Sequence, residues 1–155
     1  MSGRTMTADS TDRAYWVQVF TPKTWQEFCA AGAKVTGFRS ARWWRIQQLK
    51  PRDLLLCYLS GVGKFIGILE VESEAYVDES PIWKGEAFPC RTDVKMVVAL
   101  DSDTAVPIRD LRDRLSIFRT THWGLYLISS PTKWSVSDAE AVMEAIYSAR
   151  TDARP

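Results

Sequence analysis

The central segment of the chain, residues 54–75, constrains the fold more than any other part of the sequence. Leu54 to Ser60 is short and almost entirely apolar, which is typical of a strand covered on both faces. Gly61-Val62-Gly63 follows and predicts a hairpin turn. The returning segment, Phe65 to Ala75, ends in glutamates at every second position, which indicates a strand with one solvated face. We therefore expect a hairpin of two strands at the centre of the fold.

Helices and further strands are expected on both sides of this hairpin. Residues 14–20 are rich in β-branched and aromatic side chains and predict a strand, and Thr21 can cap a helix that has Pro22 in its first turn. The other expected elements are a loop at 33–40, a helix at 40–49 capped by Ser40, a strand at 90–99, a short helix or turn at 107–115, a strand or irregular edge at 122–128, and a last helix that opens with the capping box Ser137 to Glu140. This mixture favours an α+β or partly closed barrel arrangement over an alternating doubly wound sheet.

Length and composition predict one soluble domain. The chain has 155 residues, of which 46% are apolar and 25% are charged, and it is long enough to bury a core. We expect a disordered tail at residues 1–13, the domain at 14–149 and a C-terminal tail at 150–155. No stretch is apolar enough for a signal peptide or a membrane span, which predicts a cytoplasmic protein without a membrane partner. The oligomeric state stays open.

The net charge of +1 hides an uneven distribution of charged residues. Residues 1–66 hold ten Lys or Arg against four Asp or Glu, whereas residues 67–155 hold ten against fifteen. The basic residues between Arg39 and Lys64 are close enough in sequence to make one positive face, although an ordinary solvated surface explains them as well.

Residues suited to catalysis or to metal binding are scarce. His122 is the only histidine, so a catalytic triad or a histidine-rich metal site has almost no material. Cys29, Cys57 and Cys90 are widely spaced and are expected to be reduced thiols. The segment 61–64 lacks the longer glycine frame and the following Ser or Thr of a phosphate-binding loop. We therefore expect a binding protein and not an enzyme, without a cofactor or a metal.

Aromatic residues at the ends of elements and in loops point to a binding surface. Phe38, Tyr58, Trp83 and one of the adjacent Trp43 and Trp44 stand where a ring is harder to explain as core. Only one of the two adjacent tryptophans can join the apolar stripe of the predicted helix, so the other is exposed or lines a cleft. Flat rings stack on nucleobases, and nearby arginines can hold the phosphates. For each ring, simple packing is the alternative.

Several segments resemble the EVE domain family, which is PUA-like and related to YTH domains. The resemblance rests on Lys50-Pro-Arg-Asp-Leu-Leu-Leu-Cys-Tyr58, on Gly67-Ile-Leu-Glu-Val71 and on Trp123-Gly-Leu-Tyr126, and it covers roughly residues 14–148. It implies an α+β fold, a mixed β pseudo-barrel of five to six strands flanked by short helices. It also implies a pocket that accepts a modified base extruded from DNA or RNA.

The likeness to YTH domains implies part of an aromatic cage. Ser80-Pro-Ile-Trp83 is similar to a YTH segment whose tryptophan forms one cage wall. Phe38 stands where YTH domains have another cage tryptophan, and Arg52 departs from the glycine that is usual before the family's aspartate.

These observations together predict a noncatalytic module that reads a modified, for example methylated, nucleobase flipped into an aromatic pocket. The predicted partner is DNA or RNA that carries the modified base. The predicted nucleobase-binding residues are Phe38, Ser40, Trp43, Tyr58, Ser60 and Trp83, and the predicted phosphate contacts are Arg39, Arg42 and Lys133.

Two other functions remain open at the level of the sequence. One is a small PUA-like hydrolase or ribonuclease, although the Gly-x-Lys-x-x-Glu-x-Arg signature of the ASCH family is not found in the chain. The other is a protein-interaction module that uses the same aromatic surface.

Overall fold

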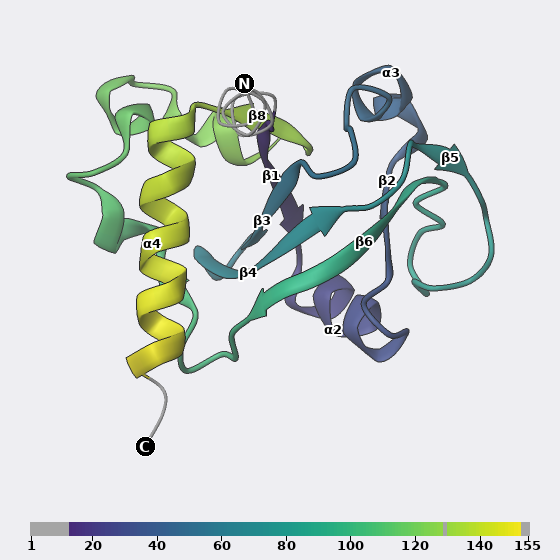
Figure 1. Cartoon of the computed structure of the whole chain (residues 1–155), viewed down its shortest axis with the longest axis horizontal. Helices are drawn as coiled ribbons and strands as arrows, with labels where there is room; N and C mark the ends of the chain where they lie inside the picture. The colour runs from purple at the N-terminus through teal and green to yellow at the C-terminus, as the bar shows by residue number, and fades with distance from the viewer. Residues whose placement is uncertain (1–12, 129, 153–155) are drawn as a thin grey trace, which may run out of the picture.

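The computed structural model describes residues 13–128 and 130–152, which form one strongly curved mixed sheet with helices around it (Figure 1). The strands are β1 Tyr15–Phe20, β2 Val35–Phe38, β3 Leu54–Leu59, β4 Lys64–Val71, β5 Tyr76–Val77, β6 Cys90–Ala99, β7 Val106–Pro107 and β8 Thr132–Trp134. Six of them follow one another in the order β2-β6-β4-β3-β1-β8, while β5 pairs with β6 and β7 pairs with β4. The expected pseudo-barrel of five to six strands is confirmed.

The centre of the sheet is the predicted hairpin. All six residues of β3 are buried, and β3 pairs with β4 on one side in antiparallel fashion and with β1 on the other in parallel fashion. Buried Asp53 fixes the start of β1, because its carboxylate accepts hydrogen bonds from the backbone N–H of Ala14 and from Nε1 of Trp16, both at 3.0 Å. The aspartate therefore has a structural role.

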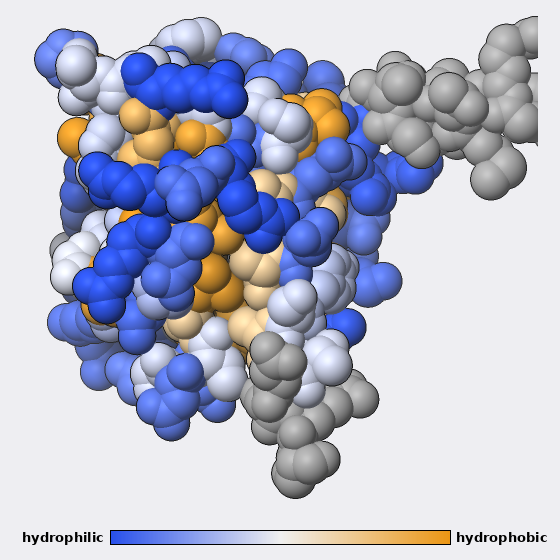
Figure 2. Space-filling view, turned by 90° about the vertical axis from the view of Figure 1, so that its left-hand side faces the viewer, coloured by the Kyte–Doolittle hydropathy of each residue, from blue (hydrophilic) through white to orange (hydrophobic). Residues whose placement is uncertain are grey.

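The helices are α2 Pro22–Ala30, α3 Trp43–Ile46 and α4 Val136–Asp152, and the 3-10 segments are η1 Ser40–Arg42, η2 Ile108–Leu111, η3 Ser116–Arg119 and η4 Trp123–Leu127. Helix α4 packs against β1, β3, β4, β6 and β7 and closes one side of the curved sheet. Figure 2 shows this side, where a strip of hydrophobic residues is bordered by hydrophilic ones. At 17 residues, α4 agrees with the last helix expected from the sequence, beginning one residue earlier. No helix in the described ranges has the length and apolar character needed to cross a membrane.

Strands β1 and β2 meet at a seam where the sheet curls round on itself. They are not neighbours in the strand order, but the side chain of Gln18 in β1 reaches β2. Its Nε2 donates to Oγ1 of Thr36 at 2.6 Å and to the carbonyl oxygen of Gly37 at 3.3 Å. A side-chain amide thus joins two strands that the backbone ladder leaves apart.

Four local predictions were wrong. Residues 35–38 form strand β2 instead of a loop, because they pair with β6, and the helix expected at 40–49 is reduced to η1 and one turn of α3. The segment expected as a strand or irregular edge at 122–128 contains the 3-10 segment η4. Ser135, and not Ser137, caps α4, since its Oγ accepts from the backbone N–H of Asp138.

The ends of the predicted domain are only partly within the described residues. The expected N-terminal tail lies outside them except for Arg13. Helix α4 continues to Asp152, so the first residues of the expected C-terminal tail are helical.

Candidate functional site

A cavity of about 270 Å³ lies where the ends of β1 and β2 come together. Its volume is slightly below the range of about 300–1,000 Å³ found for drug-sized ligands, so it suits a small molecule. Five stretches that are far apart in the sequence line it, and the residues are Val19, Phe20, Thr21, Thr24, Gly37, Phe38, Arg39, Arg42, Ser60, Glu86, Phe88, Ile128 and Ser130.

Three phenylalanines give the cavity aromatic walls. Phe20 ends β1, Phe38 ends β2, and Phe88 comes from the loop before β6. Phe38 is only 3% exposed, so the sheet holds its ring firmly in place. Phe88 has a φ of 44°, a left-handed conformation that is unusual for a bulky residue and typical of positions under functional constraint.

The loop that carries Phe88 is anchored by a buried arginine. Arg91 is 1% exposed, and its guanidinium donates to the carbonyl oxygens of Phe88, Ala87 and Ser80 at 3.1, 3.0 and 2.6 Å. The same guanidinium lies 5.5 Å from the ring centre of Trp83. Hydrogen bonds from a charged donor are stronger than neutral ones, so Arg91 positions this wall of the cavity.

The rim of the cavity is polar and cationic. Arg39 makes a bidentate ion pair with Glu86, with both N–O distances at 3.0 Å, and this hydrogen bonding raises the pKa of the guanidinium. Both side chains are exposed, so the pair adds at most about 1 kcal/mol to stability and can exchange partners readily. Arg42 lines the cavity nearby. Ser60 and Ser130 add hydroxyl groups, and Oγ of Ser130 accepts from the backbone N–H of Val19 at 3.0 Å.

The cavity brings together four of the nine predicted site residues. They are Phe38, Arg39, Arg42 and Ser60, which come from β2, from the turn after it and from the end of β3. Their roles in binding stay predictions. The other five, Ser40, Trp43, Tyr58, Trp83 and Lys133, lie outside its lining.

Trp83 lies behind the wall instead of forming it. The residue is 6% exposed, and its Nε1 donates to the carbonyl oxygen of Thr24 at 3.1 Å. Its ring meets that of Phe88 edge to face, with the centres 5.2 Å apart. The residue that faces the cavity from this loop is therefore Phe88, and Trp83 supports it.

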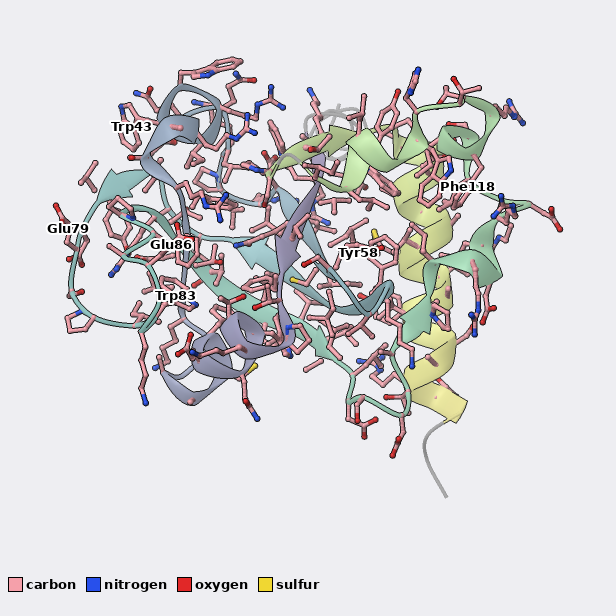
Figure 3. The ribbon with its side chains drawn as sticks, turned by 180° about the vertical axis from the view of Figure 1, so that it is seen from behind. Trp43, Tyr58, Glu79, Trp83, Glu86 and Phe118 are labelled. Atoms are coloured by element: carbon pink, nitrogen blue, oxygen red, sulfur yellow. The ribbon has the colours of Figure 1, made fainter. Side chains whose placement is uncertain are left out.

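Tyr58 belongs to another part of the molecule. Its ring packs on Phe65 with centres 5.2 Å apart, and burial raises the pKa of its hydroxyl. Figure 3 shows it well away from Trp83 and Glu86, on the side of the sheet toward α4. Its position near the end of β3 suggested a site residue, but its side chain lies on the side of the sheet that faces α4.

Trp43, Ser40 and Lys133 also lie outside the cavity. Trp43 is half-buried and packs against the core, whereas its neighbour Trp44 is exposed with the guanidinium of Arg45 over its ring at 5.1 Å. One of the two tryptophans was expected to be exposed, and Trp44 is that one. Ser40 is exposed in η1, and Lys133 is exposed on β8 beside a different hollow.

The sequence did not reveal several of the lining residues. Phe20 could have been noticed as the aromatic end of the first strand, next to the cap Thr21. Phe88 and Ser130 carry no local signal, because their place depends on how remote loops fold back. Glu86 has no sequence signal either, because its role depends on its ion pair with Arg39, which is 47 positions away in the chain.

The groups in the cavity are suited to holding a flat ligand. The rings can stack on its faces, and the hydroxyls can donate to or accept from its edge. Within residues 13–128 and 130–152, no group of three or more His, Cys, Asp or Glu could hold a metal ion, and His122 lies outside the cavity. The cysteines Cys29, Cys57 and Cys90 are free thiols, of which Cys29 is exposed.

Solved structures share this fold at low sequence identity. A hypothetical protein from Leishmania major is 20% identical with a TM-score of 0.64, over 93% of this chain and 99% of that one. The YTH domain of Mmi1 in complex with RNA is 12% identical with a TM-score of 0.65, over 90% and 81%. Atu2648 from Agrobacterium tumefaciens is 17% identical with a TM-score of 0.58, over 88% and 92%.

No curated protein sequence matches the chain. The EVE domain pattern matches residues 14–148, which is most of the chain and agrees with the resemblance seen in its motifs. The protein therefore belongs to the EVE domain family.

Proposed function

We propose that this protein is a noncatalytic nucleic-acid-binding module that accepts one modified nucleobase, extruded from its strand, in the cavity between β1 and β2. The observation that carries the proposal is the cavity itself. It has phenyl walls, a volume of about 270 Å³ and a rim with Arg39 and Arg42. The fold is shared with a YTH domain whose structure was solved with RNA, which supports a nucleic acid as the ligand.

Stacking can offset the cost of taking a base out of its strand. Extrusion costs a few kcal/mol, whereas stacking on aromatic side chains contributes about 1–3 kcal/mol per base. Phe88, the half-buried ring of the lining, is the one that can supply it, because Phe38 is only 3% exposed and supports the cavity from the core. Arg39 and Arg42 stand at the rim, where the phosphates on either side of an extruded base would pass.

Preference for a modified base follows from burial of the added group. Burying one methyl group contributes about 0.8 kcal/mol, which is about a 4-fold preference over the plain base. The hydroxyls of Ser60 and Ser130 can bond the polar edge of the base and fix its orientation. In this proposal the apolar wall recognises the modification and the serines recognise the base.

Binding to defined oligonucleotides tests the proposal. Short single-stranded DNA and RNA, each with one 5-methylcytosine or one N6-methyladenine or the plain base, are titrated and followed by fluorescence polarisation. We expect tighter binding to at least one modified strand. Phe88→Ala should weaken that binding about 5- to 100-fold, since one stacking face is lost.

A matched variant separates loss of the site from general damage. Tyr147 on α4 is also a half-buried aromatic residue and also contacts another side chain, since the guanidinium of Arg150 lies 5.1 Å from its ring centre, but it does not line the cavity. Tyr147→Ala should therefore bind as the wild type does. Equal binding of all strands, unchanged by Phe88→Ala, would remove the proposal. Cleavage of the labelled strands would instead favour the nuclease alternative.

A further inference from the structure

A second hollow, of about 350 Å³, lies directly beside the cavity. Two stretches of the chain contribute residues to both sites: Arg42, Ile128 and Ser130 line the cavity, and Arg45, Tyr126 and Thr132 line the hollow. Each of these cavity residues is only two or three positions along the chain from one of the hollow residues, so the two sites are neighbours. Figure 3 shows the turn that carries Trp43 at the same edge of the molecule as the segment around β8.

The second hollow and the ridge beside it expose several large apolar side chains. Leu125 is 62% exposed, Tyr126 is 37% exposed, and Ile128 on the ridge toward the cavity is 69% exposed. Large exposed apolar groups that lie together mark binding surfaces. Of the described residues that line the hollow, none is acidic, and Arg45 gives it a positive charge.

Arg45 holds a hydrogen-bond donor that has no acceptor. Its Nε is buried and unpartnered within the described part of the chain, while its guanidinium lies 5.1 Å from the ring centre of Trp44. A buried donor normally has a partner, so the guanidinium of Arg45 has hydrogen-bonding capacity that its neighbours do not use fully. The fork of an arginine matches the oxygens of a phosphate.

We propose that the second hollow binds the nucleotide next to the extruded base, with Tyr126 stacking on its base and Arg45 contacting the phosphate between the two nucleotides. This inference rests on the proposed function of the cavity. A nucleic acid strand fits better than a protein segment, because the hollow continues the cavity along two shared stretches of the chain and has an arginine in place. The ligand of the whole face is then at least two nucleotides long.

Comparing a nucleoside with a trinucleotide tests the second subsite. The probes are 5-methylcytidine and N6-methyladenosine, each as the free nucleoside and as the centre of a trinucleotide between two uridines, titrated by calorimetry. The wild type should bind one trinucleotide more tightly than the matching nucleoside. Tyr126→Ala should weaken the trinucleotide about 5- to 100-fold and leave the nucleoside unchanged.

Conservative and remote variants serve as controls. Tyr126→Phe keeps the ring and should bind as the wild type does. The side chain of Tyr126 is not needed to hold the loop, since Nε1 of Trp134 bonds its backbone carbonyl oxygen at 3.4 Å. Arg45→Gln should lower the slope of log affinity against log salt by about 0.7, as the loss of one phosphate contact does. Arg109→Gln, an exposed arginine in η2, should not change that slope.

The possible failures differ. The second subsite is overturned if the trinucleotide binds no more tightly than its nucleoside. It is also overturned if the trinucleotide binds Tyr126→Ala and Arg45→Gln as tightly as the wild type. Either result leaves the proposed role of the cavity intact. A hollow that takes a protein segment gives the same results. Absence of binding to any modified nucleoside or strand overturns the proposed function and this inference together.

Discussion

Gly37 shows how one residue decides the shape of the cavity. A Cβ at this position would lie 2.6 Å from the carbonyl oxygen of Phe88 and 2.9 Å from Cζ3 of Trp83. Both distances are shorter than real contacts, and the nearer atom belongs to the backbone. Glycine is therefore required because β2 and the loop of Phe88 approach each other too closely for any side chain.

Replacing Gly37 with alanine should push this loop away. We expect Gly37→Ala to lower the free energy of unfolding by about 1–3 kcal/mol, the usual cost of overpacking, and to weaken binding to a modified strand because Phe88 moves. Urea unfolding and the polarisation assay measure the two effects. Gly85→Ala in the same loop adds a Cβ that meets nothing within 4 Å, and it should change stability by less than about 0.5 kcal/mol. Equal stabilities of the two variants would contradict the close approach.

Arg52 is a residue whose conformation the resemblance could foresee. The resemblance to the EVE domain family implies a glycine before the aspartate, and Arg52 has a φ of 82°, the left-handed region that glycine adopts most easily. Its backbone N–H donates to the carbonyl oxygen of Val71 at 2.7 Å, which ties the turn to the end of β4. The motif therefore encodes a turn, and the arginine tolerates it.

At the scale of elements, the short strand β5 depends on a side-chain bond to β6. The hydroxyl of Tyr76 donates to Oδ1 of Asp93 at 2.6 Å. Burial and this hydrogen bond raise the pKa of Tyr76 to about 12. In the unfolded chain the tyrosine has its ordinary pKa of about 10. The folded protein therefore keeps the hydroxyl proton of Tyr76 to a higher pH than the unfolded chain does.

The stability of the protein should fall between about pH 10 and pH 12. Below pH 10 both states are protonated and the contribution of Tyr76 is complete, whereas at higher pH the unfolded state loses the proton first and is favoured. Tyr76→Phe removes this titration, so its stability should fall less than that of the wild type between pH 9 and pH 11. Urea unfolding at the two pH values measures the difference. The same fall in both proteins would mean that Tyr76 does not contribute.

Elements with a strong local pattern could be predicted from the sequence. The strand Cys90–Ala99 was predicted with its observed bounds, and α2 begins after the predicted cap Thr21. Strand β2 was missed because four residues that include Gly37 have little preference of their own, and pairing with β6 makes them a strand. Segment η4 was missed because its apolar residues fit a strand equally well.

At the scale of the whole molecule, the site could be predicted only in part. Phe38 and Arg39 were found because the resemblance marks their segment, and they do line the cavity. Phe88 and Ser130 reach it from loops more than 40 residues apart, which no local pattern encodes. Trp83 and Phe88 belong to the same loop, and the sequence does not show which of the two rings faces the cavity. In the structure Phe88 lines it and the ring of Trp83 packs behind.

The closure of the curved sheet depends on Gln18, the side chain that joins β1 to β2. It is buried, its Nε2 has two acceptors on β2, and its Oε1 has no partner among the described residues. A carboxylate in its place would lose both donors and face the carbonyl oxygen of Gly37. Burial without a cationic partner raises the pKa of a carboxyl group above its ordinary value of about 4.3.

Gln18→Glu should therefore destabilise the protein in a manner that depends on pH. At pH 4 the new group is largely neutral in both states and the loss is small. As the pH rises from the ordinary pKa toward the raised one, the unfolded state ionises first, and at pH 7 we expect a loss of more than about 3 kcal/mol. Gln26→Glu on exposed α2 makes the same chemical change and should stay within about 0.5 kcal/mol of the wild type. Because the seam borders the cavity through Gly37, Gln18→Glu should also weaken binding of a modified strand at pH 7. If the stability of Gln18→Glu at pH 7 equals that of the wild type, β1 and β2 are held together by other contacts.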